Sequence, residues 1–235
     1  MILIIRSKVD PDKLILDLRK RKYQFHIEPF MYFKRLYPKI LLDPNAHYLV
    51  SSLQAINFLK KNKKIIRNGN FLAIGKKVKK ELQLIGVNKI HHIFEDSYQL
   101  LNFIKKDKRI KHIHHLTGTV TNEVLSGISK NKGIKYNKKK VYIVKFKREL
   151  TPQLRKLVSN QEVKIMIHYS LKVADEFFKR LHKGEKSFFK TNITHICMSD
   201  RISRGLKKIG VIEKKLKISK KPNHKSMMLL LKHNI

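Results

Sequence analysis

The two halves of the sequence repeat one order of motifs, and this repeat constrains the fold more than any other feature. Each copy has a serine before an apolar-patterned segment, a later apolar run that ends in a small residue, and a segment that stops at glycine. The copies run from Ser52 to Gly86 and from Ser170 to Gly210. A glycine stop alone is common, but four elements in the same order are not. We infer two similar α/β domains in one chain.

Short apolar runs alternate with segments of helical periodicity along the chain. The run at 3–5 is of the kind that parallel sheets bury on both faces, and Asp10-Pro11 is typical of a helix start. We expect strands at 3–5, 23–27, 48–50, 71–74, 110–116, 141–146, 164–168 and 195–198, and helices at 53–60, 78–84, 123–129, 154–157, 173–181 and 202–208. This alternation predicts the α/β fold class, with a parallel sheet covered by helices on both faces.

The chain is strongly basic. It has 54 Lys and Arg against 17 Asp and Glu in 235 residues, a formal charge of +37. A hydrophobic content of 42% excludes a disordered polycation. The charge either serves an anionic partner, such as nucleic acid or a polyanionic small molecule, or reflects a compositional drift toward Lys, Ile and Asn. Charge alone does not decide between them.

Membrane insertion and secretion are not expected. The longest apolar run, 227–231, has five residues, whereas a spanning helix needs about 20. Residues 1–5 lead directly into Arg6 without a cleavage-type site, which indicates a strand and not a signal peptide. A single cysteine, Cys197, excludes a disulfide framework and a thiolate metal cage. We expect a cytoplasmic protein with no membrane partner.

Small, hydroxyl and basic residues follow the predicted strands. In parallel sheets, ligands bind beyond the carboxyl ends of strands, where backbone N–H groups and helix starts suit carboxylates or phosphates. The candidate binding residues are Ser51, Ser52, Gly75, Lys76, Lys77, Thr117, Gly118, Tyr169, Ser170, Ser199 and Arg201. Each loop alone could equally be an ordinary helix cap or turn, but five such loops together favour an anion-binding function.

Other chemistries lack their motifs. The chain has neither a G-x-x-x-x-G-K-[ST] phosphate loop nor a G-x-G-x-x-G turn after its first strand. Histidines cluster at His91-His92 and at 112–115, but no spaced cysteine or carboxylate completes a tetrahedral metal site. We therefore expect neither a metal nor a nucleotide cofactor.

Several segments, in order, resemble the uroporphyrinogen-III synthase family. They are Leu-Ile-Ile-Arg at 3–6, Leu-Val-Ser-Ser-Leu-Gln-Ala at 49–55, Ala-Ile-Gly at 73–75, Leu-Thr-Gly at 116–118 with Asn-Glu at 122–123, Gly133 followed by Val-Tyr at 141–142, His-Tyr-Ser at 168–170 and Ile-Cys-Met-Ser at 196–199. The resemblance covers nearly the whole chain. The sequence departs from the family where Asn122 replaces an arginine, Ser199 a glycine, and Arg201-Ile202 a threonine pair.

The resemblance implies a fold and a reaction. The fold would be two flavodoxin-like parallel-sheet domains joined by a two-stranded connector. One domain would comprise 1–29 and 149–235, the other 34–145, with connectors near 28–33 and 146–149. The reaction would be cyclisation of hydroxymethylbilane, a linear polyanionic tetrapyrrole, with inversion of ring D, by a monomer without a cofactor.

Residue roles follow from the same resemblance. Tyr142 would be the catalytic hydrogen-bond donor to the departing hydroxyl. Arg6 and Asn122 would join the loop residues in binding the substrate's carboxylates. The competing hypothesis is a basic RNA- or DNA-binding protein that uses the same loops for phosphates, although the chain has no recognised nucleic-acid-binding module.

Overall fold

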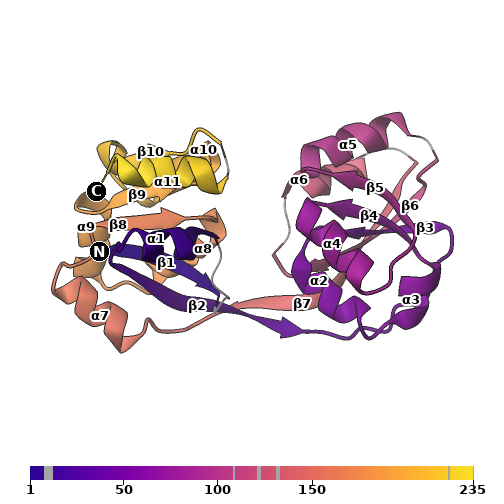
Figure 1. Cartoon of the computed structure of the whole chain (residues 1–235), viewed down its shortest axis with the longest axis horizontal. Coiled ribbons are helices and arrows are strands. Elements are labelled where there is room, and N and C mark those ends of the chain that lie inside the picture. Colours follow the sequence, from indigo (N-terminus) through magenta and orange to yellow (C-terminus); the bar gives the residue numbers. More distant parts are fainter. Residues whose placement is uncertain (8–12, 108, 121–122, 131–132, 222, 235) are drawn as a thin grey trace. The chain divides into compact units, whose positions relative to one another are not determined.

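The computed structural model describes residues 1–7, 13–107, 109–120, 123–130, 133–221 and 223–234. The chain divides into two compact units (Figure 1). Unit 1 comprises Met1–Tyr32 and Phe146–Ile235, and unit 2 comprises Phe33–Lys145. No helix among the described residues is long and apolar enough to cross a membrane.

Unit 1 is a parallel sheet with helices on both faces. Its strands are β1 (Ile2–Ser7), β2 (Phe25–Arg35, which continues into unit 2), β8 (Ile165–His168), β9 (Thr194–Cys197) and β10 (Leu216–Ile218). Its helices are α1 (Lys13–Lys20), α7 (Pro152–Ser159), α8 (Leu171–Lys179), α9 (Lys183–Thr191), α10 (Asp200–Ile209), α11 (His224–Lys232) and the 3-10 helix η2 (Glu213–Lys215). The strand order is β2-β1-β8-β9-β10, the order of flavodoxin-like sheets.

Alternation along β1 explains the layers of unit 1. Ile2 and Ile4 pack in one core with residues of α1 and α11, whereas Leu3 and Ile5 pack on the other face with α7, α8, α9 and α10. Successive side chains of a strand point to opposite faces, so a run without polar residues indicates a strand covered on both sides.

Unit 2 is a second parallel sheet with a different strand order. Its strands are β3 (Ala46–Val50), β4 (Asn70–Ile74), β5 (Ile90–Phe94), β6 (His112–Gly118) and β7 (Lys135–Phe146), in the order β7-β6-β3-β4-β5. Helices α2 (Leu53–Leu59), α3 (Lys63–Asn68) and α4 (Lys76–Leu84) cover one face. Helices α5 (Ser97–Lys106), α6 (Glu123–Ser126) and the 3-10 helix η1 (Gly127–Lys130) cover the other.

The long strands β2 and β7 are neighbours and connect the two sheets into one ten-stranded order. In unit 1, the N–H of Lys147 donates to the carbonyl of Phe30 (2.8 Å), and in unit 2 the N–H of Leu36 donates to the carbonyl of Val141 (2.9 Å). Residue numbers therefore rise along β2 as they fall along β7. This pair is antiparallel, unlike the other strand pairs described. The structure shows an α/β fold with a mostly parallel sheet, as the sequence predicts.

Two strand boundaries differ from the prediction. The sequence predicts an end of the second strand before Pro29, but β2 continues through this residue to Arg35. The register of β1 against β2 shifts immediately after the Arg6–Pro29 pair, and proline is tolerated beside such an irregularity because its missing N–H interrupts no regular ladder. Strand β7 begins at Lys135 and not at 141, because the lysine run at 138–140 pairs with β6.

Candidate functional site

The carboxyl ends of β3 and β6 form the point in unit 2 where the connections change faces. The chain leaves β3 toward α2 on one face and leaves β6 toward α6 on the other. Adjacent parallel strands with diverging connections leave a crevice between their carboxyl ends, the usual ligand position in open α/β sheets.

A pocket of about 410 Å³ lies at this crevice. It is lined by Ser51, Ser52, Ile74, Glu95, Asp96, Ser97, Tyr98, Thr117, Val120, Leu125 and Tyr142. The structure thus brings together four of the site residues that were predicted from the sequence, namely Ser51, Ser52, Thr117 and Tyr142. Its volume is at the lower end of the range for small-molecule sites, about 300–1,000 Å³.

Gly118 determines where the ring of Tyr142 lies. A Cβ atom at Gly118 would fall 2.2 Å from the ring, so only glycine permits this contact. The two residues are paired across β6 and β7 at a register shift between Thr117 and Gly118. Phe33 packs edge-on against the same ring, with centroids 5.9 Å apart. Tyr142 is consequently 6% exposed, and no described residue hydrogen-bonds its hydroxyl group.

A chain of hydrogen bonds runs from the pocket into the sheet. The hydroxyl oxygen of Ser51 lies 2.8 Å from Nε2 of His115, and Nδ1 of His115 lies 2.6 Å from the hydroxyl oxygen of Tyr136. Burial, with a smaller contribution from the charge of Lys138, lowers the pKa of His115 to about 4. His115 is therefore neutral at physiological pH.

Two carboxylates line the β5 side of the pocket, and the sequence analysis did not select them. Asp96 caps α5, its carboxylate accepting hydrogen bonds from the N–H groups of Tyr98 and Gln99, both at 2.9 Å. Glu95 is exposed. An acidic residue directly before an apolar-patterned segment is a helix-start signal, and could have located this side of the pocket once β5 was recognised.

The predicted basic turn after β4 lies beside the pocket lining and not in it. Gly75 adopts a left-handed φ of +91°, which favours glycine, and it starts α4. Lys76 and Lys77 occupy the first turn of this helix and are exposed. Asn122 lies outside the described residues.

Unit 1 has its own change of faces, between β1 and β8. Arg6 lies near the end of β1, and Tyr169 and Ser170 follow β8, with Ser170 capping α8 through the N–H of Val173. Ser199 precedes α10, and Arg201 is in its first turn. Ile202, where the family has threonine, is buried in the core with Leu206 and does not supply a polar group to the loop.

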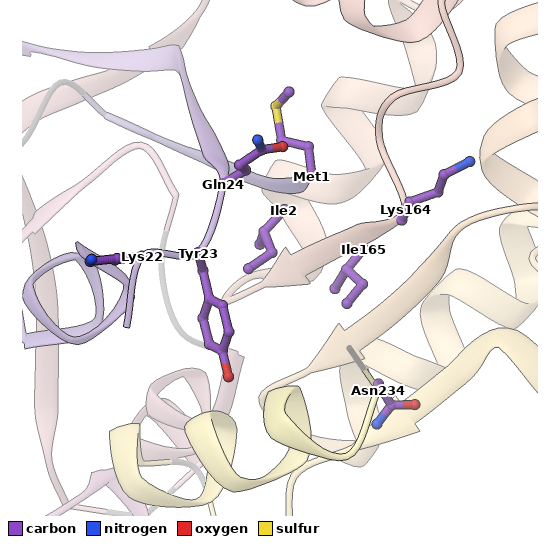
Figure 2. A pocket seen from close by; sticks show the side chains of 8 residues that line it. All are labelled: Met1, Ile2, Lys22, Tyr23, Gln24, Lys164, Ile165 and Asn234. Atoms are coloured by element: carbon purple, nitrogen blue, oxygen red, sulfur yellow. The ribbon is translucent and has the colours of Figure 1, made fainter. Parts of the chain in front are cut away.

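A different pocket, of about 330 Å³, lies in unit 1 at the amino-terminal ends of the strands, opposite the predicted binding loops (Figure 2). Met1, Ile2, Lys164 and Ile165 contribute from the amino-terminal ends of β1 and β8, and Tyr23 and Asn234 complete much of the wall. None of the predicted binding residues that the structure describes lines it. Within the described ranges, no group of three or more His, Cys, Asp or Glu side chains is arranged to hold a metal ion.

Comparison with known proteins agrees with this architecture. The family model described as uroporphyrinogen-III synthase HemD matches residues 12–228. The crystal structure of uroporphyrinogen-III synthetase from Helicobacter pylori 26695 is similar, with a TM-score of 0.64 and 19% identity over 98% of each chain. A mutant uroporphyrinogen III synthase from the extremely thermophilic bacterium Thermus thermophilus has a TM-score of 0.60 and 11% identity, covering 99% of this chain and 98% of its own.

No curated protein sequence matches the chain. The structural likenesses, at these low identities, establish the fold, and the family model extends over most of the 235 residues. The chain therefore belongs to the uroporphyrinogen-III synthase family.

Proposed function

We propose that the pocket at the carboxyl ends of β3 and β6 binds one end of hydroxymethylbilane, and that Tyr142 is the catalytic donor there. Family membership assigns the chain uroporphyrinogen-III synthase activity, a hydro-lyase reaction of tetrapyrrole biosynthesis, and favours it over nucleic-acid binding. The observation that carries the assignment of Tyr142 is its place in the pocket lining, where its ring packs on Gly118 and its hydroxyl group has no hydrogen-bond partner among the described residues.

The reaction begins with loss of the ring A hydroxyl group. The C–O bond of the hydroxymethyl group breaks, the pyrrole nitrogen supplies electrons to form an azafulvene, and the oxygen leaves as water after receiving a proton. A phenol that donates a hydrogen bond to this oxygen stabilises the charge that develops on it. The substituted carbon of ring D then attacks, and fragmentation with reclosure gives the inverted isomer. The protein positions the two chain ends for these steps.

The charges around the pocket favour one orientation of a polyanion. Glu95 and Asp96 repel carboxylates from the β5 side. Ser51, Ser52 and Thr117 offer hydroxyl groups on the opposite side. We therefore place the acetate and propionate groups near these hydroxyls, with Lys76 and Lys77 as exposed cations close to the next strand end.

The loops of unit 1 extend the proposal. Arg6 lies near the carboxyl end of β1. The other predicted residues of this unit follow β8 and β9, where helices α8 and α10 begin, namely Tyr169, Ser170, Ser199 and Arg201. These residues would bind further carboxylates, and Asn122 belongs to the same proposed set. We also propose that the units act as domains 1–29 with 149–235 and 34–145, that the strands β2 and β7 connect them, and that the chain acts as a cytoplasmic monomer.

The test is a product-isomer assay. Purified protein receives freshly generated hydroxymethylbilane, and type I and type III uroporphyrins are separated after oxidation. Excess type III product over the spontaneous type I product supports the synthase. Folded protein that yields type I alone overturns the proposal.

Tyr142→Phe tests the donor. A hydrogen bond to a charged group contributes about 1.5–3 kcal/mol, so we expect kcat to fall about 10- to 100-fold. Tyr37→Phe is the matched control, because Tyr37 is an exposed tyrosine of the same unit that contacts Lys61 and does not line the pocket. Equal kcat in Tyr142→Phe and wild type would remove Tyr142 from the catalytic role.

A further inference from the structure

We infer that His115 and Tyr136 are positioning residues that hold the Ser51 hydroxyl as a hydrogen-bond donor toward a substrate carboxylate. This inference rests on the proposed function of the same pocket. Ser51 lines the pocket, whereas His115 is fully buried and Tyr136 is half-buried behind it. Two hydrogen bonds connect the three side chains in series, from Ser51 to His115 and from His115 to Tyr136.

The direction of each hydrogen bond follows from the number of protons. A neutral imidazole has one N–H, so His115 donates to one neighbour and accepts from the other. If Nδ1–H donated to Tyr136, Ser51 would have to give its proton to Nε2. If Tyr136 donates to Nδ1, the imidazole proton lies on Nε2 and Ser51 accepts it.

Two observations favour the second arrangement. The phenol is a much stronger acid than an imidazole N–H and is the better donor, in keeping with the short 2.6 Å contact between Tyr136 and Nδ1. In addition, no other described residue accepts a hydrogen bond from the Tyr136 hydroxyl, so its proton would otherwise lack a protein partner. His115 therefore carries its proton on Nε2 and donates to Ser51.

The consequence for the ligand is specific. The oxygen of Ser51 accepts from His115, so its own proton is available to an acceptor in the pocket. Ser52 keeps its proton available in the same way but through a backbone donor, because its oxygen accepts from the N–H of Gln54 as the cap of α2. A carboxylate oxygen is an acceptor only, so it complements a serine held as a donor. Proton transfer along the line is not implied, because burial raises the pKa of Tyr136 and lowers that of His115.

The test is a double-mutant cycle with Ser51→Ala and Tyr136→Phe. Loss of a hydrogen bond to a carboxylate should raise KM about 10- to 100-fold in Ser51→Ala, with kcat nearly unchanged. Tyr136→Phe should raise KM less, because Ser51 then alternates between donating to His115 and to the ligand. The double variant should match Ser51→Ala within about twofold, since Tyr136 acts only through Ser51.

Tyr48→Phe is the matched structural control. It also removes a buried tyrosine hydroxyl from unit 2, but that hydroxyl accepts from the N–H of Asp43, before β3, away from the pocket. It should lower stability and leave KM unchanged. Additive effects of Ser51→Ala and Tyr136→Phe, or a loss in kcat instead of KM, would overturn the inference.

A second measurement separates this inference from the proposed function. Nitrogen-15 NMR distinguishes a protonated from an unprotonated imidazole nitrogen, and His115→Gln assigns the signals. We expect the Nε2–H form in the wild type and a mixture of tautomers in Tyr136→Phe. An Nδ1–H form in the wild type refutes the positioning of Ser51 whatever the activity. The expected tautomer in a protein that makes no type III product would instead count against the proposed substrate alone.

Discussion

The buried pair His168–His195 should make the stability of unit 1 depend on pH. Nε2 of His195 lies 2.7 Å from the carbonyl oxygen of Phe189, and its Nδ1 lies 2.8 Å from Nε2 of His168. Because a carbonyl only accepts, Nε2 of His195 is protonated and Nδ1 accepts from His168. A second proton on His195 would break this bond. Burial lowers the pKa of His195 to about 4 and holds that of His168 well below 6.5.

The magnitude follows from proton linkage. The unfolded chain takes up a proton near pH 6.5, whereas folded His195 resists protonation to about pH 4, so stability is complete above 6.5 and falls as the pH falls. Between roughly pH 7.5 and pH 5, His195 alone should lower the free energy of unfolding by about 2 kcal/mol. A folded-state pKa one unit higher or lower changes this figure by less than about 0.5 kcal/mol.

The assay is urea unfolding of wild type, His195→Gln and His233→Gln at both pH values. Glutamine can still donate to the carbonyl of Phe189 but does not titrate. The pH-dependent loss of stability should therefore shrink by about 2 kcal/mol in His195→Gln. His233, which is exposed beyond α11, is the control and should leave the loss unchanged. The same pH dependence in His195→Gln and wild type would refute the reasoning.

Two further substitutions test the packing around the strand ends. Gly118→Ala should displace the Tyr142 ring and lower the free energy of unfolding, measured by thermal unfolding, by about 1–3 kcal/mol, with a loss of activity like that of Tyr142→Phe. The control is Gly127→Ala, which should be tolerated because its Cβ would lie 3.5 Å from Leu101. Glu28→Gln should lower the free energy of unfolding in urea by about 1–3 kcal/mol. The reason is that fully buried Glu28 accepts hydrogen bonds from the hydroxyl group (2.6 Å) and the N–H (3.1 Å) of Thr151. Wild-type stability in Gly118→Ala or in Glu28→Gln would contradict these contacts.

The part of the site that could be predicted depends on strand ends alone. Ser51 follows the apolar run at 48–50, and Thr117 follows the strand predicted at 110–116. Parallel strands put their carboxyl ends on one edge of a sheet. Proximity in the sheet then follows from topology. The contact of Gly118 with Tyr142 could not be predicted, because it depends on a register shift between β6 and β7.

Other elements escaped prediction for physical reasons. Strand β5 contains His91 and His92 next to each other, and three of its five residues are exposed, so its sequence lacks the apolar run of a central strand. It lies at the edge of the sheet, where burial is least. The role of His115 is equally hidden, since it is one of several clustered histidines and its partners are identified only by the registers of β6 with β3 and with β7.

The division into units has a consequence for folding on the ribosome. Unit 2 is one uninterrupted stretch of chain, so all its strands are synthesised before the last part of unit 1. In unit 1, the N–H of Lys164 donates to the carbonyl of Met1, and β1 pairs with β8. The apolar strand β1 therefore cannot pair with β8 until the chain has been synthesised past residue 168. Domains tend to fold as they emerge, so we expect the inserted unit to fold first and the N-terminal strand to depend longest on protection from aggregation.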